Sequence, residues 1–113
     1  MLVIGVAFAV FGAAQVSAHH GWSEYNSDKT LNLTGKVQKV NYESPHVTIQ
    51  LETPEKVWIA VLAPPSRMQN RGLPQDGLRA GMAVSVAGYA HRSESGEMRA
   101  ERIILDGKTV ELR

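Results

Sequence analysis

The sequence of 113 residues contains no cysteine, which excludes disulfide bonds as a source of stability. Aromatic residues make up only 6%, too few for the stacking surface of a protein that binds single-stranded nucleic acid. Neither sign of charge dominates, because twelve basic side chains are balanced by eleven acidic ones and the formal net charge is +1. We therefore expect no nucleic-acid partner and no general attraction to anionic membranes.

A long hydrophobic run is also absent. Residues 2–14 carry no charge, but a helix that spans a membrane needs roughly 20 apolar residues. The stretch ends in Val16-Ser17-Ala18, small residues of the kind that a signal peptidase recognises, although no Lys or Arg precedes it. The pattern predicts that residues 1–18 are a cleaved secretory signal, so that the mature chain is periplasmic or secreted without membrane attachment. An uncleaved membrane anchor is the alternative.

The remaining chain has room for one small domain preceded by an arm. Residues 19–29 are polar, contain the aromatic side chains Trp22 and Tyr25, and follow the period of neither a helix nor a strand, so we expect an N-terminal arm that lies against the domain. Within residues 30–113, apolar alternation and turn residues predict six strands and one short helix. The expected strands span residues 31–42, 47–52, 57–62, 82–89, 98–105 and 109–112, and the helix spans 64–72.

This order of elements predicts an all-β fold. Three strands, a short helix and two or three further strands are typical of the five-stranded OB barrel. Gly35 and Gly88 stand where long strands would have to curl. Residues 57–62 are apolar on both faces, which predicts a strand buried on both sides. We therefore expect a small OB-like barrel of five to six strands with one short helix between strands three and four; an up-and-down barrel or a split sandwich is the alternative.

Short motifs in a fixed order resemble a known family. The chain is similar to small exported bacterial proteins grouped as domain of unknown function 6152, which usually have Asn where this chain has Ser44. The resemblance implies export and a compact β fold and carries no established activity. The motifs that carry it are His19-His20, Leu33-Thr34-Gly35-Lys36-Val37, Pro45-His46, Trp58, Arg71-Gly72, the segment from Gly81 to Gly88, and Asp106-Gly107-Lys108.

The expected mature terminus has the chemistry of a metal chelate. If cleavage follows Ala18, the free α-amine and the Nδ1 atom of His19 can bind one metal ion, as half of a copper histidine brace. His20 can add a nitrogen, and His46, which alternation places outside the core, can complete the site. Copper is the expected ion, with zinc or nickel as alternatives. The competing interpretation is that both terminal histidines are simply solvated.

Other candidates for chemistry are weaker. Ser66, Glu52 and Glu55 lack the partners of a nucleophile or of a catalytic carboxylate pair, so we expect no enzyme activity. His91 lies near a hairpin tip, and Met68 in the short helix is a candidate for an exposed soft metal ligand, whereas the alternation favours core packing for Met82. We interpret the arginines as a solvated basic rim; they are Arg67, Arg71, Arg79, Arg92 and Arg99.

Two functions therefore remain open. The first is a periplasmic binding protein that holds copper or another divalent metal through His19, His20 and His46. The second is a metal-free interaction module that binds an envelope protein or a saccharide on the face of the barrel.

Overall fold

The computed structural model describes residues 21–113, so the predicted ligands His19 and His20 lie outside the described residues. A short 3-10 turn precedes the barrel, and one helix and a second 3-10 turn join its third and fourth strands. In chain order the elements are η1 (Gly21–Glu24), β1 (Leu31–Asn41), β2 (Thr48–Glu52), β3 (Val57–Val61), α2 (Pro65–Asn70), η2 (Gln75–Gly77), β4 (Ala83–Ala90), β5 (Glu97–Leu105) and β6 (Lys108–Glu111).

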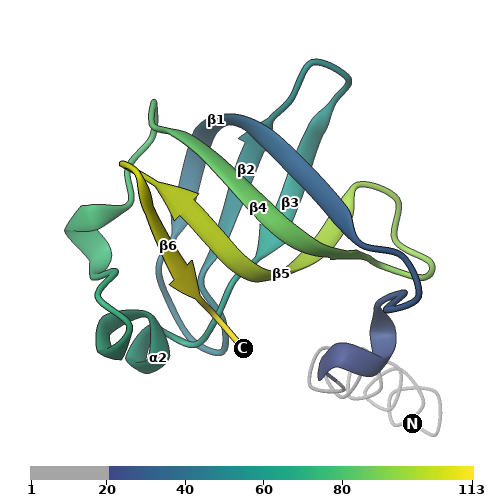
Figure 1. Ribbon diagram of the computed structural model, residues 1–113, viewed down its shortest axis with the longest axis horizontal. Helices are drawn as coiled ribbons and strands as arrows, with labels where there is room; N and C mark the ends of the chain where they lie inside the picture. The colour runs from purple at the N-terminus through teal and green to yellow at the C-terminus, as the bar shows by residue number, and fades with distance from the viewer. Residues whose placement is uncertain (1–20) are drawn as a thin grey trace, which may run out of the picture.

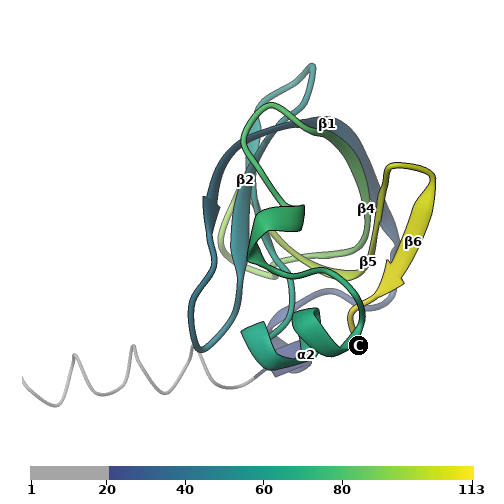
Figure 2. The same cartoon turned by 90° about the vertical axis from the view of Figure 1, so that its left-hand side faces the viewer.

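The strands form one closed barrel. Antiparallel pairing gives the order β3-β2-β1-β4-β5-β6, and a parallel pairing of β3 with β5 closes the ring. Figure 1 shows β6 as an extra strand beside β5, and Figure 2 shows the strands curled around a common centre. The prediction of an OB-like barrel with one short helix between strands three and four is confirmed. The turn η2 lies in the connection between α2 and β4.

Two glycines allow neighbouring strands to approach closely. A side-chain Cβ at Gly35 would overlap the carbonyl oxygen of Glu52, and one at Gly88 would overlap the carbonyl oxygen of Arg99. The pairing of β4 with β5 shifts register between Ala87 and Gly88, which is the irregularity expected where a long strand bends. The sequence prediction for Gly35 and Gly88 therefore has a direct steric basis.

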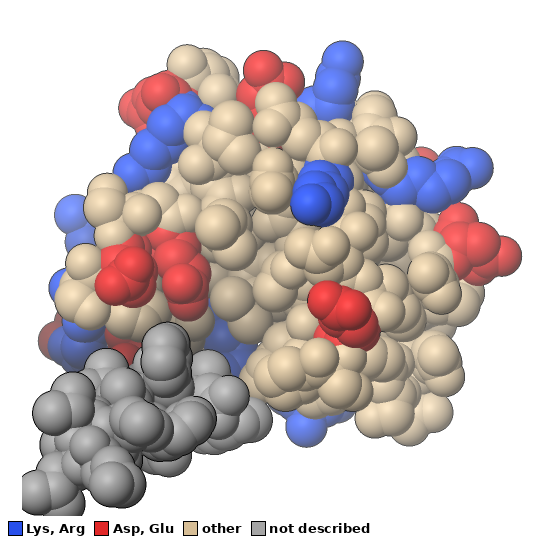
Figure 3. Space-filling model, turned by 180° about the vertical axis from the view of Figure 1, so that it is seen from behind, with Lys and Arg blue, Asp and Glu red and all other residues tan. Residues whose placement is uncertain are grey.

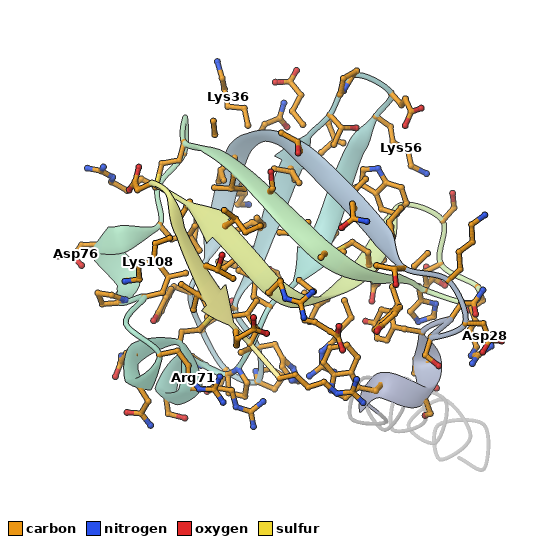
Figure 4. All side chains as sticks on the ribbon, viewed as in Figure 1. Asp28, Lys36, Lys56, Arg71, Asp76 and Lys108 are labelled. Atoms are coloured by element: carbon orange, nitrogen blue, oxygen red, sulfur yellow. The ribbon has the colours of Figure 1, made fainter. Side chains whose placement is uncertain are left out.

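The core fills the inside of the barrel, and α2 closes one of its ends. Ile49, Leu51 and Ile103 are fully buried strand residues. Met68 of α2 is also fully buried, so the prediction of an exposed methionine here is wrong: the helix turns its apolar side onto the barrel. Arg71 and Lys108 fix this end further, because Arg71 donates to the carbonyl of Glu111 and Lys108 to that of Gly72 (Figure 4).

The prediction of a third strand buried on both sides is wrong for one face. Trp58 and Ala60 turn towards the core, but Val57 and Ile59 are 44% and 46% exposed. A barrel strand needs only one buried face, and an apolar residue on the other face does not by itself show burial. Within residues 21–113, no helix is long and apolar enough to cross a membrane.

We predict that Gly88→Ala destabilises the protein by about 2–3 kcal/mol, because the new methyl group would overlap the backbone of β5 and force the strands apart. Gly77→Ala is the matched control: its Cβ would meet the end of the Leu73 side chain at 3.3 Å and no backbone atom that closely, and its cost should stay within about 1 kcal/mol. Urea unfolding measures both values. Equal costs would contradict the steric account.

Candidate functional site

A cavity of about 340 Å³ lies on the outer face of the barrel, where the arm meets two loops. The arm contributes η1 and Tyr25, the β1–β2 connection contributes His46, and the β4–β5 connection contributes His91. The remaining wall comes from the strands, including the seam between β3 and β5. The lining residues are Gly21, Glu24, Tyr25, Pro45, His46, Thr48, Val61, His91, Glu97 and Arg99.

Backbone hydrogen bonds hold the arm at this position. The amide of Asn26 donates to the carbonyl of Ala90 at 2.9 Å, and the amide of Arg92 donates to the carbonyl of Glu24 at 2.9 Å. The ring of Trp22 packs edge-on against Tyr89, with 6.1 Å between the centroids. In Figure 1 the arm accordingly lies next to the β4–β5 hairpin. The arm is therefore a wall of the cavity.

Arg99 is the one polar or charged residue among residues 21–113 that is buried, with 6% of its surface exposed. Its Nη2 atom donates to Nε2 of His46 at 3.2 Å. Its guanidinium carbon lies 4.4 Å from the ring centroid of Trp22, a cation–π contact. The Nε atom is buried and has no hydrogen-bond partner. Strand alternation points Arg99 away from the core, so its burial comes from the arm.

The surroundings of this guanidinium are unfavourable to its charge. Burial lowers the pKa of Arg99, the interaction with Tyr25 acts in the opposite direction, and the positive charges of Arg67 and Arg113 lower the pKa further. Arginine nevertheless keeps its proton in proteins, so the positive charge remains at the cavity wall. The other acidic and basic side chains of the described residues are not buried, and Figure 3 shows them scattered over one face of the molecule.

Tyr25 and Glu97 form a second polar pair in the cavity. The phenol of Tyr25 donates to Oε2 of Glu97 at 2.5 Å. Burial, the hydrogen bond and the charge of Glu97 raise the pKa of Tyr25 well above its ordinary value. Tyr25 therefore remains a neutral phenol, and Glu97 has one oxygen engaged within the wall.

His91 organises the β4–β5 loop. Its Nδ1 atom accepts hydrogen bonds from the backbone amides of Ser93 at 3.1 Å and Glu94 at 2.9 Å. In the neutral ring the proton is therefore on Nε2, which lies 3.7 Å from Oε1 of Glu24. The ring also packs edge-on against Tyr25, with 5.0 Å between the centroids. This histidine holds the loop against the arm.

His46 is the predicted metal ligand that can be placed, and it lines the cavity. A guanidinium can only donate, so the contact with Arg99 uses the lone pair on Nε2 and leaves the proton of a neutral ring on Nδ1. To bind a metal through Nε2, His46 would have to release Arg99. Within residues 21–113, no three His, Cys, Asp or Glu side chains gather in a way that could hold a metal ion.

Sequence reasoning missed Arg99. It was grouped with Arg67, Arg71 and Arg92 in a solvated rim, but these bind separate carbonyl groups: Arg67 that of Leu112, Arg71 that of Glu111 and Arg92 that of Ser23. The available signal was indirect. Trp22 and Tyr25 in a short polar arm indicate that the arm packs on the barrel, but no residue pattern shows which strand side chain it covers.

We predict that Tyr25 makes the folded protein sensitive to alkali. The unfolded chain loses the phenol proton at about pH 10 while the folded chain retains it, so the free energy of unfolding falls as pH rises above about 10. Tyr25→Phe should cost about 2 kcal/mol at pH 7 and should weaken this alkaline decline. Urea unfolding at pH 7 and pH 11 checks both points. Glu97→Gln is the control, because it removes the negative charge but keeps an acceptor; an unchanged decline in both variants would contradict the assignment.

Solved structures confirm the fold and show no more than the fold. The crystal structure of a ZRD-deleted mutant of TiaS in complex with agmatine matches with a TM-score of 0.56 and 18% identity over 77% of this chain. A crystal structure of TiaS in complex with a tRNA and ATP matches with a TM-score of 0.53 and 21% identity over 79%. The chain spans only 27% and 20% of those two proteins.

Sequence comparison identifies a family for the chain, which the structural comparison does not. No curated protein matches it. A family model does match, over residues 8–99, which include most of the barrel and the cavity residues from the arm to β5. The chain therefore belongs to this family, which is described as a family of unknown function (DUF6152).

Proposed function

We propose that the protein is an exported binding protein that holds a small polar ligand in the cavity beside the arm. The observation that carries this proposal is the position of the cavity. OB barrels bind ligands on the face of strands two and three and at the loops that follow strands one and four. Thr48 of β2, Val61 of β3, His46 and His91 come from these four places and line one cavity.

The size and lining of the cavity favour a saccharide over a protein segment. A volume of about 340 Å³ is at the lower end of the range for small-molecule sites. Glu24, Glu97 and Arg99 supply charged acceptors and donors for hydroxyl groups, and the Tyr25 ring supplies an apolar surface. This mixture suits a ring that carries several hydroxyl groups.

Binding is also a better account than catalysis. Glu97 accepts from Tyr25, and Nδ1 of His91 accepts from two loop amides. These contacts engage the candidate general bases in the wall of the cavity. Nucleophilic catalysis needs a base within hydrogen-bond reach of a nucleophile, whereas the contacts seen here hold the walls of the cavity in place.

We predict that Val61→Phe abolishes saccharide binding, because the larger side chain fills the cavity from β3 without changing its charge. Val57→Phe is the matched control on the same strand; Val57 is exposed and lies outside the cavity, so binding should persist. Amide chemical shifts recorded with glucose, galactose, N-acetylglucosamine, glucuronate and galacturonate measure binding. At least one sugar should shift the amides of cavity residues in the unaltered chain. Equal binding by both variants would refute the cavity as the site.

A metal chelate at the terminus is the second candidate, and the position of Gly21 favours it. Gly21 lines the cavity, and His20 is joined to it directly, so His19 and His20 are within two residues of the cavity rim. We propose that His19, through its amine and imidazole, together with His20 and with His46 released from Arg99, could hold copper there, with zinc or nickel as alternatives. This proposal requires cleavage after Ala18.

Copper(II) titration tests the chelate. We predict at least a tenfold loss of affinity when one residue is added before His19, because the added residue removes the free amine from the chelate. His46→Gln should weaken binding less. Affinity should also fall as pH drops below about 8, where the amine takes up its proton. Intact mass must first confirm His19 as residue one, and equal affinity of the extended and native chains would rule the terminal chelate out.

A further inference from the structure

The charge balance around Arg99 differs from that of other arginines in the described chain. Arg113 lies 2.9 Å from a carboxylate oxygen of Glu101, and Arg102 lies 3.1 Å from one of Glu111; both arginines are at least partly exposed. Arg99 is buried, yet none of the ion pairs formed within residues 21–113 includes it. Its guanidinium instead contacts the neutral ring of Trp22 and a histidine nitrogen.

A buried cation without a counter-charge is costly. Withdrawing a guanidinium from water costs several kcal/mol unless a negative group or a full set of hydrogen bonds compensates for the lost solvation. Here the unpartnered Nε atom leaves a donor unsatisfied as well. Arg67 and Arg113 add to the positive field instead of reducing it. The fold thus holds this guanidinium at the wall of a cavity with no carboxylate of the described chain paired to it.

We infer that Arg99 binds an oxyanion of the ligand, and that this ligand is a hydroxylated acid with a single carboxylate, such as a sugar acid; the inference rests on the proposed function in taking the cavity as the ligand site. A guanidinium offers paired N–H donors in the geometry that a carboxylate accepts. Trp22 stacks on one face of the guanidinium, which leaves its edge for planar hydrogen bonding. A carboxylate there would supply the missing counter-charge.

The two glutamates in the cavity limit the ligand to one negative charge. Glu97 is engaged by Tyr25, and Glu24 lies 3.7 Å from Nε2 of His91, so both are fixed in the same wall as Arg99. A second anionic group on the ligand would meet these carboxylates and be repelled. Hydroxyl groups would instead find acceptors. The arrangement therefore selects against phosphate dianions and polyanions.

NMR titration of the processed, metal-free chain tests the inference with four probes: acetate, glucuronate, glucose and inorganic phosphate. The side-chain Nε–H signal of Arg99 reports on binding at its guanidinium, and that of Arg102, in a surface ion pair with Glu111, is the control. We expect acetate and glucuronate to shift the Arg99 signal, glucose, which has no oxyanion, to shift it much less, and phosphate at pH 8 to act at least tenfold more weakly than glucuronate. Glucuronate should bind at least tenfold more tightly than glucose.

Variants separate recognition from a structural role of Arg99. Arg99→Gln should remove the preference for glucuronate over glucose while binding of glucose persists, and Arg99→Lys should retain part of the preference. Arg102→Gln, at a surface ion pair with Glu111, should change neither sugar's affinity. If Arg99→Gln loosens the arm, the Arg99 signal of the unaltered chain still tests whether an oxyanion binds there.

The outcomes distinguish the two proposals. If glucose and glucuronate shift the cavity amides equally and the Arg99 signal does not move, the oxyanion site is wrong and the binding function stands. If acetate moves the Arg99 signal but no sugar binds, the oxyanion site stands and the saccharide proposal fails. If no probe affects the cavity, both are wrong. Equal affinity for phosphate and glucuronate would contradict the inference that the cavity favours a ligand with a single negative charge.

Discussion

The parallel pairing of β3 with β5 is the contact on which the other features depend, because it turns a sheet into a barrel. In this pairing Val61 is opposite Arg99 and Ile59 is opposite Glu97. Alternation directs all four side chains outward, so the closure seam presents two charged groups beside two apolar ones. The candidate site is built on this seam. The rigid core behind it fixes the spacing of Glu97 and Arg99, which a loop could not do as well.

The arm covers this seam and so forms the cavity beside it. Without Trp22 and Tyr25, Arg99 and Glu97 would be ordinary solvated residues on the outside of a strand. Trp22 of the arm stacks on Arg99, Tyr25 donates a hydrogen bond to Glu97, and the backbone of Tyr25 pairs with that of His91. The arm therefore buries the charge of Arg99 and keeps the phenol of Tyr25 protonated. Such burial is unfavourable for an isolated cation, and this cost is the basis of our proposal that Arg99 binds an anion.

The order of strands, the helix and the curling at Gly35 and Gly88 could be predicted from the sequence because each depends on local signals: alternation, turn residues and the absence of a side chain. The exposure of Val57 and Ile59 could not, since an apolar run looks the same on a buried strand and on a barrel wall. The burial of Met68 and Arg99 depends on which distant segment packs over them. The sequence analysis proposed His46 as a candidate ligand, but the hydrogen-bond partner of His46, Arg99 of β5, lies 53 residues away.

His46 links the two ligand chemistries proposed for this cavity. Its Nε2 lone pair can accept from Arg99 or bind a metal, but it cannot do both at once. A metal at His46 would therefore remove the hydrogen bond that Arg99 donates to this histidine and place a second positive charge beside Arg99. An oxyanion that contacts both groups would offset this repulsion, so metal and acid would then each favour binding of the other to the same extent, as thermodynamic linkage requires. Without such a bridging anion, the same contact makes Arg99 and a metal competitors for one nitrogen.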